Sequence, residues 1–387
     1  MNTYSAALAL TVFVVGAASS PAEEISFQRQ VRGILSDKCF RCHGPDAAKR
    51  QAGLRLDLEV DAKKVLESGV RAIVPGHSAD SELVARIVAT DADLKMPPED
   101  SGKTLTASEI DILQRWIAQG AEWGRHWAFT EIQRPKVPVM SASTTQVTEI
   151  DHFVRARLPE KGLTPAGEAD RVSLIRRLTL DLNGLPPTVV ETNAFVADKS
   201  PQAYETVVAR LLSSPRFGEH MARYWLDAAR YGDTHGLHLD NYREMWAYRD
   251  WVVNAFNQNK PFDVFTIEQL AGDLLESPTD EQIVATGFNR CHVTTSEGGS
   301  IAEEVHVRNV VDRVVTTGTV FMGLTLDCTR CHDHKFDPLT MNDFYSLYAY
   351  FNSIDGAPLD GNKKDPAPVL KVLNGQQKLQ IADLETK

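Results

Sequence analysis

Apolar residues recur at the spacing of amphipathic helices in two stretches of the chain, which are separated by a stretch with little periodicity. In the first stretch, helices are expected over residues 25–35 and 83–88. Thr106-Ala107-Ser108-Glu109 has the pattern of a capping box. It predicts a helix that begins there and runs to about Gln119, with Gly120 as its stop.

The longer second stretch has the same periodicity and predicts a larger helical unit. Asn183-Gly184-Leu185-Pro186-Pro187 ends one of its helices, and residues 356–368 have the composition of a loop. The expected helices cover residues 150–158, 171–182, 201–212, 216–230, 248–257 and 344–351, with a polar helix that starts at 376 and has barely begun when the sequence stops. The expected fold class is therefore mainly α.

Length and charge limit the function classes. A chain of 387 residues suits two or three domains, and a hydrophobic content of 43% lets each of them bury a core. The formal net charge of -11 and the lack of a basic run argue against a nucleic-acid partner. The expected division is a signal peptide at 1–22, a first domain at 23–128, a linker at 129–149, a second domain at 150–355, and a loop with the start of a helix at 356–387.

Residues 1–22 have the pattern of a secretory signal peptide. Ala6 to Ala18 is an apolar run too short to span a bilayer, and Ser20-Pro21-Ala22 offers a cleavage site. No Lys or Arg precedes the run, so an uncleaved N-terminal anchor remains the alternative. We expect a periplasmic or otherwise exported protein with no membrane span after signal cleavage.

Four of the five cysteines belong to two Cys-x-x-Cys-His motifs, and Cys291 is left over. The motifs are Cys39-Phe40-Arg41-Cys42-His43 and Cys328-Thr329-Arg330-Cys331-His332. This spacing puts two thiols one helical turn apart with an imidazole beside them. That arrangement suits two thioether bonds to haem and iron binding by the histidine.

Half of a zinc site, a redox dithiol and a disulfide are the competing interpretations of such a motif. A zinc site would need a second pair of ligands nearby. Residues 44–127 contain no cysteine and only two histidines, His77 and His126. We therefore expect haem c on Cys39 and Cys42 with His43 binding iron. A second haem c is expected on Cys328 and Cys331, with His332 binding iron.

The first iron needs a sixth ligand from its far side, and Met96 is the best candidate. It lies in Leu94-Lys95-Met96-Pro97-Pro98, where two prolines stiffen a loop that could hold a sulfur over the haem. His77 is the second choice, although its ordinary interpretation is a surface turn residue. His/Met ligation predicts a comparatively oxidising, low-spin electron-transfer haem.

The far side of the second iron has no comparable motif. We rank His292 first, because the glycines of the segment 290–299 indicate a loop folded close to a cofactor. The other candidates are His306, His235 and His238. The ordinary interpretation of each histidine alone is structural.

Two polar clusters of the second domain could relay protons or bind a metal. They comprise Asp227, Arg230, Asp233, His235, His238 and Asp240, and a second group of Glu297, Glu303 and Glu304. We prefer the alternative that they form a buried salt-bridge network that fixes helix packing.

Several longer runs point to a known family. In the first domain they are Cys39 to His43 with Gly44-Pro45, Gly53 to Asp57, Val74-Pro75-Gly76, Lys95 to Pro98 and Trp116 to Ala121. In the second they are Asp181 to Pro187, Tyr248 to Val252, Glu268 to Asp273, Glu297-Gly298-Gly299 and Cys331 to Pro338. On these runs, residues 25–128 resemble the planctomycete-type cytochrome c domain. Residues 150–352 resemble the domain of unknown function that usually follows it.

The resemblance implies a class I-like cytochrome c helical domain followed by a larger helical domain that carries the second haem motif. It maps the family's haem ligands onto His43 and Met96, and it supports electron transfer with a redox partner in the cell envelope. It supplies no substrate. Family members usually continue with another large domain, so we expect this chain to be a partial or shortened relative.

Two function classes stay open at this point. The first is a two-haem electron carrier, and the second is a di-haem redox enzyme of peroxidase-like type. A strong distal ligand on the second iron would indicate a carrier, and a water-filled distal side would indicate catalysis. A third interpretation, a binding module with a vestigial second motif, predicts one haem per chain.

Overall fold

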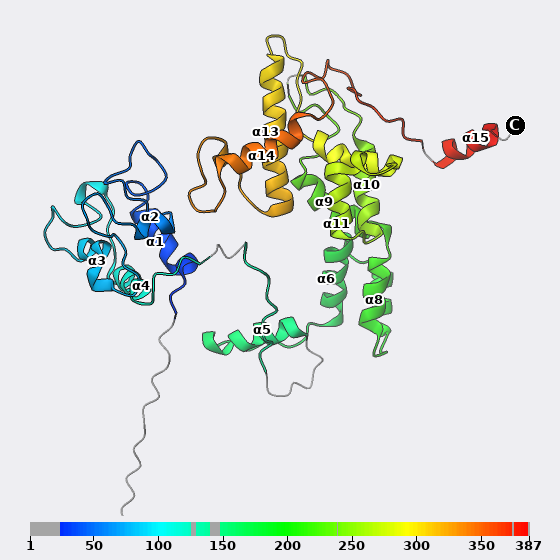
Figure 1. Cartoon of the computed structure of the whole chain (residues 1–387). Coiled ribbons are helices and arrows are strands. Elements are labelled where there is room, and N and C mark those ends of the chain that lie inside the picture. The colour runs from blue at the N-terminus through cyan, green and yellow to red at the C-terminus, as the bar shows by residue number, and fades with distance from the viewer. Residues whose placement is uncertain (1–23, 125–128, 140–147, 238, 374, 386–387) are drawn as a thin grey trace, which may run out of the picture. The chain divides into compact units, whose positions relative to one another are not determined.

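The computed structural model describes residues 24–124, 129–139, 148–237, 239–373 and 375–385. The expected signal peptide and residues 140–147 of the expected linker lie outside this part of the chain. The described residues are mainly helical and include no strand beyond isolated bridges, which confirms the expected fold class. They form two compact units, of which the first ends at Gln133 and also includes Lys335–Pro338 (Figure 1). The finer domain boundaries stay predictions.

The described residues of the first unit form four short α-helices around one apolar core. The helices are α1 (Arg32–Lys38), α2 (Glu59–Lys63), α3 (Glu82–Ile87) and α4 (Ala107–Ala118), and a π-helical turn, Phe27–Val31, precedes α1. Leu35 of α1 and Leu113 of α4 are fully buried together with Ile73 from the loop between α2 and α3. This core lies directly beneath the first cysteine motif, because Cys39 and Phe40 also belong to it.

Helix α4 begins where the sequence predicts it. The Thr106 hydroxyl accepts a hydrogen bond from the Glu109 backbone at 3.2 Å, and the Glu109 carboxylate accepts one from the Thr106 backbone at 2.7 Å. This capping box satisfies two backbone donors that the first turn of a helix leaves unpaired. Further along α4, Trp116 packs against Phe27 with their ring centroids 5.4 Å apart, which ties the helix to the start of the unit.

The second unit is a larger assembly of helices (Figure 1). Its helices are α5 (Glu149–Arg157), α6 (Arg171–Asn183), α7 (Val189–Ala197), α8 (Ala203–Leu212), α9 (Pro215–Ala228), α10 (Trp246–Asn257), α11 (Phe262–Ala271), α12 (Asp280–Ala285), α13 (Ala302–Met322), α14 (Met341–Asn352) and α15 (Gly375–Glu385). None of the helices among the described residues combines the length and the apolar character that crossing a bilayer requires.

Helices α9 and α10 approach each other closely at Gly218. A methyl group on this residue would meet the Val253 carbonyl oxygen at 2.4 Å, so only glycine fits this contact. The Gly218 backbone also donates a hydrogen bond to the Asn257 side chain at 2.8 Å. The packed pair fixes the direction of the chain just ahead of Arg243, which belongs to the pocket described below.

Helices α13 and α14 pack against each other over a separate core that includes Val310, Val314 and Phe344 (Figure 1). Leu326 belongs to the same core and comes just before the second cysteine motif. It lies so close to Gly318 of α13 that a methyl group there would meet its side chain at 2.4 Å. The second motif is therefore attached to the C-terminal end of α13 by a packed leucine.

Candidate functional site

The first cysteine motif forms a tight turn at the end of α1. Cys39 caps the helix, with its backbone donating to Leu35 at 2.8 Å. The backbones of Cys42 and His43 both donate to the Cys39 carbonyl oxygen, at 3.1 and 2.9 Å. A methyl group on the following Gly44 would meet the Phe40 carbonyl oxygen at 2.2 Å, so the turn requires glycine there. Both thiols and the imidazole are thus carried on one compact turn.

Burial changes the chemistry of this turn. It raises the pKa of Cys39 to about 12, with smaller contributions from Asp37 and Cys42, so this thiol is protonated at neutral pH. Burial also lowers the pKa of His43, against the smaller opposing effect of the Gln51 backbone, which favours the neutral imidazole that binds iron. The Nδ1 atom of His43 is buried without a hydrogen-bond partner. Two thiols and a neutral imidazole on one turn are the donor set of a covalently attached haem, so these residues fit that group, with Nε2 of His43 as the iron-binding atom.

The two candidates for the sixth ligand differ in their surroundings. Met96 is half-buried on the loop between α3 and α4, and its backbone donates to Arg86 at 3.0 Å. His77 is exposed, with its Nδ1 atom 3.7 Å from the Asp80 carboxylate. Both residues belong to the first unit, as His43 does. The half-buried thioether therefore stays our proposal for the far side of the first iron.

The second motif lies on a short 3-10 turn after α13, Asp327–Arg330. Cys328, Cys331 and His332 are all exposed. The backbones of Cys331 and His332 donate to Cys328 at 3.3 Å, so the turn has the same connectivity as the first but longer hydrogen bonds. The Nδ1 atom of His332 lies 2.9 Å from the Asp333 carbonyl oxygen. That contact places the ring proton on Nδ1 and leaves Nε2 as the metal-binding atom, which fits a haem iron.

The structure places His292 in a different polar environment. Its side chain is buried, with Nδ1 3.2 Å from the Val293 carbonyl oxygen and Nε2 3.0 Å from the Arg313 guanidinium. Burial, and then the charge of Arg313, lowers the pKa of His292 to about 3, so the ring is neutral and accepts the hydrogen bond from Arg313. Binding iron through Nε2 would require His292 to give up Arg313.

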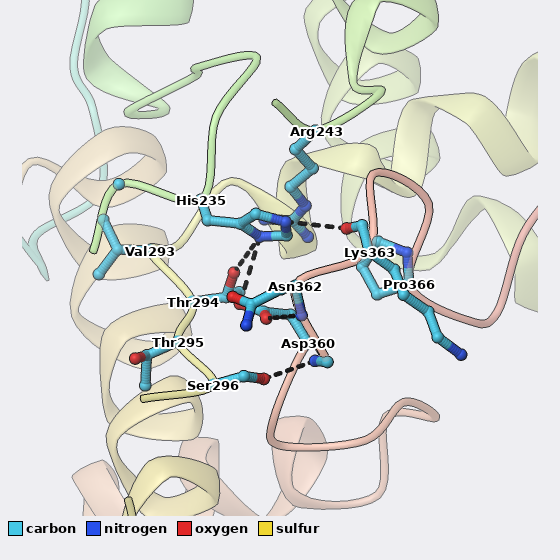
Figure 2. Close-up of polar contacts among 12 residues, drawn as sticks. His235, Arg243, Val293, Thr294, Thr295, Ser296, Asp360, Asn362, Lys363 and Pro366 are labelled. Carbon is cyan, nitrogen blue, oxygen red and sulfur yellow. Dashed lines mark hydrogen bonds and ion pairs between the residues drawn. The ribbon is translucent and has the colours of Figure 1, made fainter. Parts of the chain in front are cut away.

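The other candidate histidines are also held by contacts. The Nε2 atom of His306 lies 3.1 Å from the Asn352 side chain. His235 is buried, with Nε2 2.8 Å from the Lys363 carbonyl oxygen and Nδ1 2.7 Å from the Thr294 hydroxyl (Figure 2). His238 lies outside the described residues.

The His235 contacts do not form an acid–base triad. The Asp360 carboxylate lies 3.2 Å from Nδ1, the same ring nitrogen that contacts Thr294 (Figure 2). A relay needs the hydroxyl and the carboxylate on opposite ring nitrogens, and here the second nitrogen is taken by a backbone carbonyl group. The arrangement attaches the loop after α14 to the segment around Thr294.

The remaining polar clusters make local contacts. Asp233 accepts a hydrogen bond from Tyr231 at 2.7 Å, Arg230 pairs with Asp312, and Asp240 accepts one from the Gly236 backbone at 2.9 Å. Glu297, Glu303 and Glu304 are exposed. Within the described part of the chain, no group of three or more His, Cys, Asp or Glu side chains is arranged to hold a metal ion.

The structure also brings together residues that the sequence analysis did not connect. Arg243, Arg290 and Arg313 line one small pocket of the second unit. They come from three separate segments, and none lies in a recognisable motif. No sequence signal could therefore have indicated their convergence.

Comparison with known proteins identifies both parts of the chain. The family model described as Planctomycete cytochrome C matches residues 39–100, and the one described as Protein of unknown function (DUF1549) matches residues 149–356. The resemblance inferred from the sequence is confirmed, with the two regions in the expected order. No curated protein and no solved structure shows significant similarity to the chain.

Proposed function

The chain belongs to the DUF1549 family, with a planctomycete cytochrome c domain ahead of it, and from that premise we propose that it is an exported di-haem cytochrome c that transfers electrons at the cell envelope. A haem c group supplies one-electron transfer at its iron when it is bound. The redox partner is a further component of the envelope.

One observation carries the proposal: the first motif holds two partly buried cysteines and a half-buried imidazole on a single tight turn. Burial lowers the pKa of His43, and the neutral imidazole is the form that binds iron. A structural disulfide needs no histidine beside its cysteines, whereas a covalently attached haem uses all three side chains. A haem attached to the cysteines would bring iron to this imidazole.

We assign the residues of the first site as follows. Cys39 and Cys42 hold the group covalently, His43 binds iron from the same side, and Met96 binds it from the far side. The surrounding core of the first unit excludes water from one edge of the site. Because a thioether favours ferrous iron, this site is the more oxidising of the two.

For the second site we propose attachment to Cys328 and Cys331, with His332 binding iron through Nε2. His292 remains the candidate for the far side. To bind iron, its Nε2 atom would have to lose its hydrogen bond with Arg313. The present partners of His292 favour a second candidate function, because an iron that lacks His292 has an open position. In that case the chain is a di-haem redox enzyme in which the first haem supplies electrons to the second.

A pyridine haemochrome assay on protein matured in a periplasm, combined with a spectroscopic redox titration, tests the proposal. We expect two haems per chain and two separable reduction steps. One haem per chain would replace the carrier by a binding module with a vestigial second motif. A haem-free mature protein would overturn the proposed function altogether.

A further inference from the structure

A small cavity of about 40 Å³ lies in the second unit among four segments of the chain. Arg313 reaches it from α13, Arg290 from the segment after α12, and Arg243 from the turn before α10, while the loop after α14 closes the remaining side. Since a buried water needs roughly 10–15 Å³ on this scale, the cavity has room for about three waters or one small polar group.

Arg243 is buried, Arg290 and Arg313 are half-buried, and the hydrogen-bond partners of all three are neutral. Arg243 is 4% exposed, donates to the His292 carbonyl oxygen at 3.3 Å, and has a buried Nε atom with no hydrogen-bond partner. Arg313 donates to the Asn289 carbonyl oxygen at 2.8 Å and to His292. Arg290 donates to the Pro366 carbonyl oxygen at 2.6 Å and to that of Pro368.

Burying three cations together is unfavourable unless a negative group accompanies them. Burial lowers the pKa of Arg243 and of Arg313 to about 10. The charge of Arg290 contributes to both of these pKa shifts, and Asp360 and Asp312 oppose them in part. At neutral pH all three guanidinium groups therefore remain positively charged. They repel one another in a desolvated site, where such repulsion is stronger than in water.

Asp360 also lines the cavity, and its single charge offsets only part of the charge of the three arginines. Asp360 is 4% exposed and lies against His235 at 3.2 Å, and it accepts a hydrogen bond from the Asn362 backbone at 2.7 Å (Figure 2). Asp312 pairs with Arg230, and Asp355 is exposed on the rim. Among the described residues, no carboxylate forms an ion pair with Arg243, Arg290 or Arg313.

We propose that Arg243, Arg290 and Arg313 form a binding site for a tetrahedral oxyanion, the sulfate or phosphate group of a small molecule. Guanidinium groups present N–H donors in a planar fork that suits such oxygens. Donors from three guanidinium groups that line one cavity suit the several oxygens of a tetrahedral group, whereas one fork satisfies a planar carboxylate. The buried Asn309 side chain lines the same cavity and supplies a neutral polar group.

The rim of the pocket indicates how the ligand enters. Asp355 and Gly356 line the cavity and are exposed, so it opens to solvent beside them. The cavity accommodates only the anionic group, and the rest of a larger ligand would lie outside it. The carboxylate of Asp355 would repel the incoming anion, so Asp355→Asn is expected to tighten binding.

Isothermal titration calorimetry of the mature holoprotein with inorganic sulfate, inorganic phosphate and acetate, at constant ionic strength, tests the site. We expect sulfate or phosphate to bind at least tenfold more tightly than acetate, and the tighter of the two identifies the ligand class. Arg243→Gln should weaken binding at least tenfold. Arg308→Gln removes an exposed arginine of the same helix as Arg313 and should bind like the wild type.

Thermal unfolding keeps the proposal falsifiable if binding heats are small. Sulfate should raise the unfolding temperature of the wild type and of Arg308→Gln but not that of Arg243→Gln. In anion-free buffer, Arg243→Gln should be no less stable than the wild type, because it lacks one repelling charge. An equal rise in all three proteins would reflect general salt exclusion and would overturn the proposal. So would undiminished binding by Arg243→Gln, or acetate binding as tightly as the tetrahedral anions.

Discussion

The two Cys-x-x-Cys-His motifs share their spacing and even the arginine before the second cysteine, Arg41 and Arg330. Their surroundings differ. The first motif lies on a core that buries Phe40 and half-buries its cysteines, whereas the second presents both cysteines and its histidine to solvent. The motif therefore determines which bonds can form, and the residues around it determine how far the attached group is shielded from water.

The residue after the first cysteine accounts for much of this difference. Phe40 is 6% exposed and packs among apolar side chains, while Thr329 is fully buried and its hydroxyl donates to the Leu326 carbonyl oxygen. The first motif buries an aromatic ring, whereas the second is held by the packed Leu326 beside it and by side-chain hydrogen bonds of Thr329 and Tyr345. Because solvent exposure is one determinant of reduction potential, the two haems should differ in potential even before their ligands are considered.

Thiol reactivity in the haem-free polypeptide should show the largest difference. Cys39 has a pKa of about 12 because it is buried, so little thiolate is available, whereas Cys328 and Cys331 are exposed. We expect iodoacetamide to alkylate Cys39 at least about a hundredfold more slowly than Cys331. Peptide mass spectrometry measures both rates. Cys291, buried with a pKa of about 12, is the internal control for an unreactive thiol. Equal rates at Cys39 and Cys331 would show that the first motif is not buried before haem attachment.

Stability should separate the two anchors next. Phe40→Ala removes a buried ring and should destabilise the first unit by about 3–5 kcal/mol. Thr329→Val removes one hydrogen bond and should cost the second unit about 1 kcal/mol. Denaturant-dependent hydrogen exchange, read on peptides of each unit, measures both. Arg41→Ala and Arg330→Ala change exposed residues and serve as matched controls, and a larger cost for Thr329→Val than for Phe40→Ala would reverse the comparison.

The sixth ligand of the first iron should affect both spectrum and potential. Met96→Ala is expected to convert the first haem from low-spin to high-spin and to lower its potential, since the thioether favours ferrous iron. Ultraviolet–visible spectroscopy and redox titration of the holoprotein follow both changes. His77→Ala, which alters an exposed residue, is the matched control. Should His77→Ala give the spectral change and Met96→Ala none, the ligand assignment would pass to His77.

The smallest expected effect concerns His292. If it binds the second iron, His292→Ala should convert a low-spin ferric signal to high-spin in electron paramagnetic resonance. His306→Ala removes a histidine that contacts Asn352 and should leave the signal unchanged. A second haem that is already high-spin in the wild type would leave His292 with Arg313 and favour the enzyme over the carrier.

Local signals predicted much of the fold. The capping box at Thr106 gave the start of α4, and the helical periodicity over residues 171–182 gave α6 almost to its end at Asn183. Helix α7 was missed, although Thr188 and Glu191 form a capping box at its start. Helix α11 was missed as well, and it has no side-chain cap to mark its beginning. Periodicity alone detects such short helices poorly, because tertiary packing stabilises them.

The sites were predictable only as far as their residues are adjacent in the sequence. The cysteines and histidines of the two motifs are adjacent in sequence, so spacing alone identified them as one group. The burial of Phe40 and the exposure of Cys331 depend on residues packed from elsewhere in the chain, and spacing contains no such information. The convergence of Arg243, Arg290 and Arg313 is the extreme case, since only the folded second unit brings them together.

The most direct test of the central claim is the intact mass of the mature protein and of two matched variants. We predict that the wild type exceeds the polypeptide mass by two haem groups, and that Cys42→Ser and Cys331→Ser each weaken or abolish attachment of one haem while the other motif keeps its own. A wild-type gain of a single haem that Cys331→Ser leaves unchanged would contradict the two-haem account and reduce the second motif to an exposed turn.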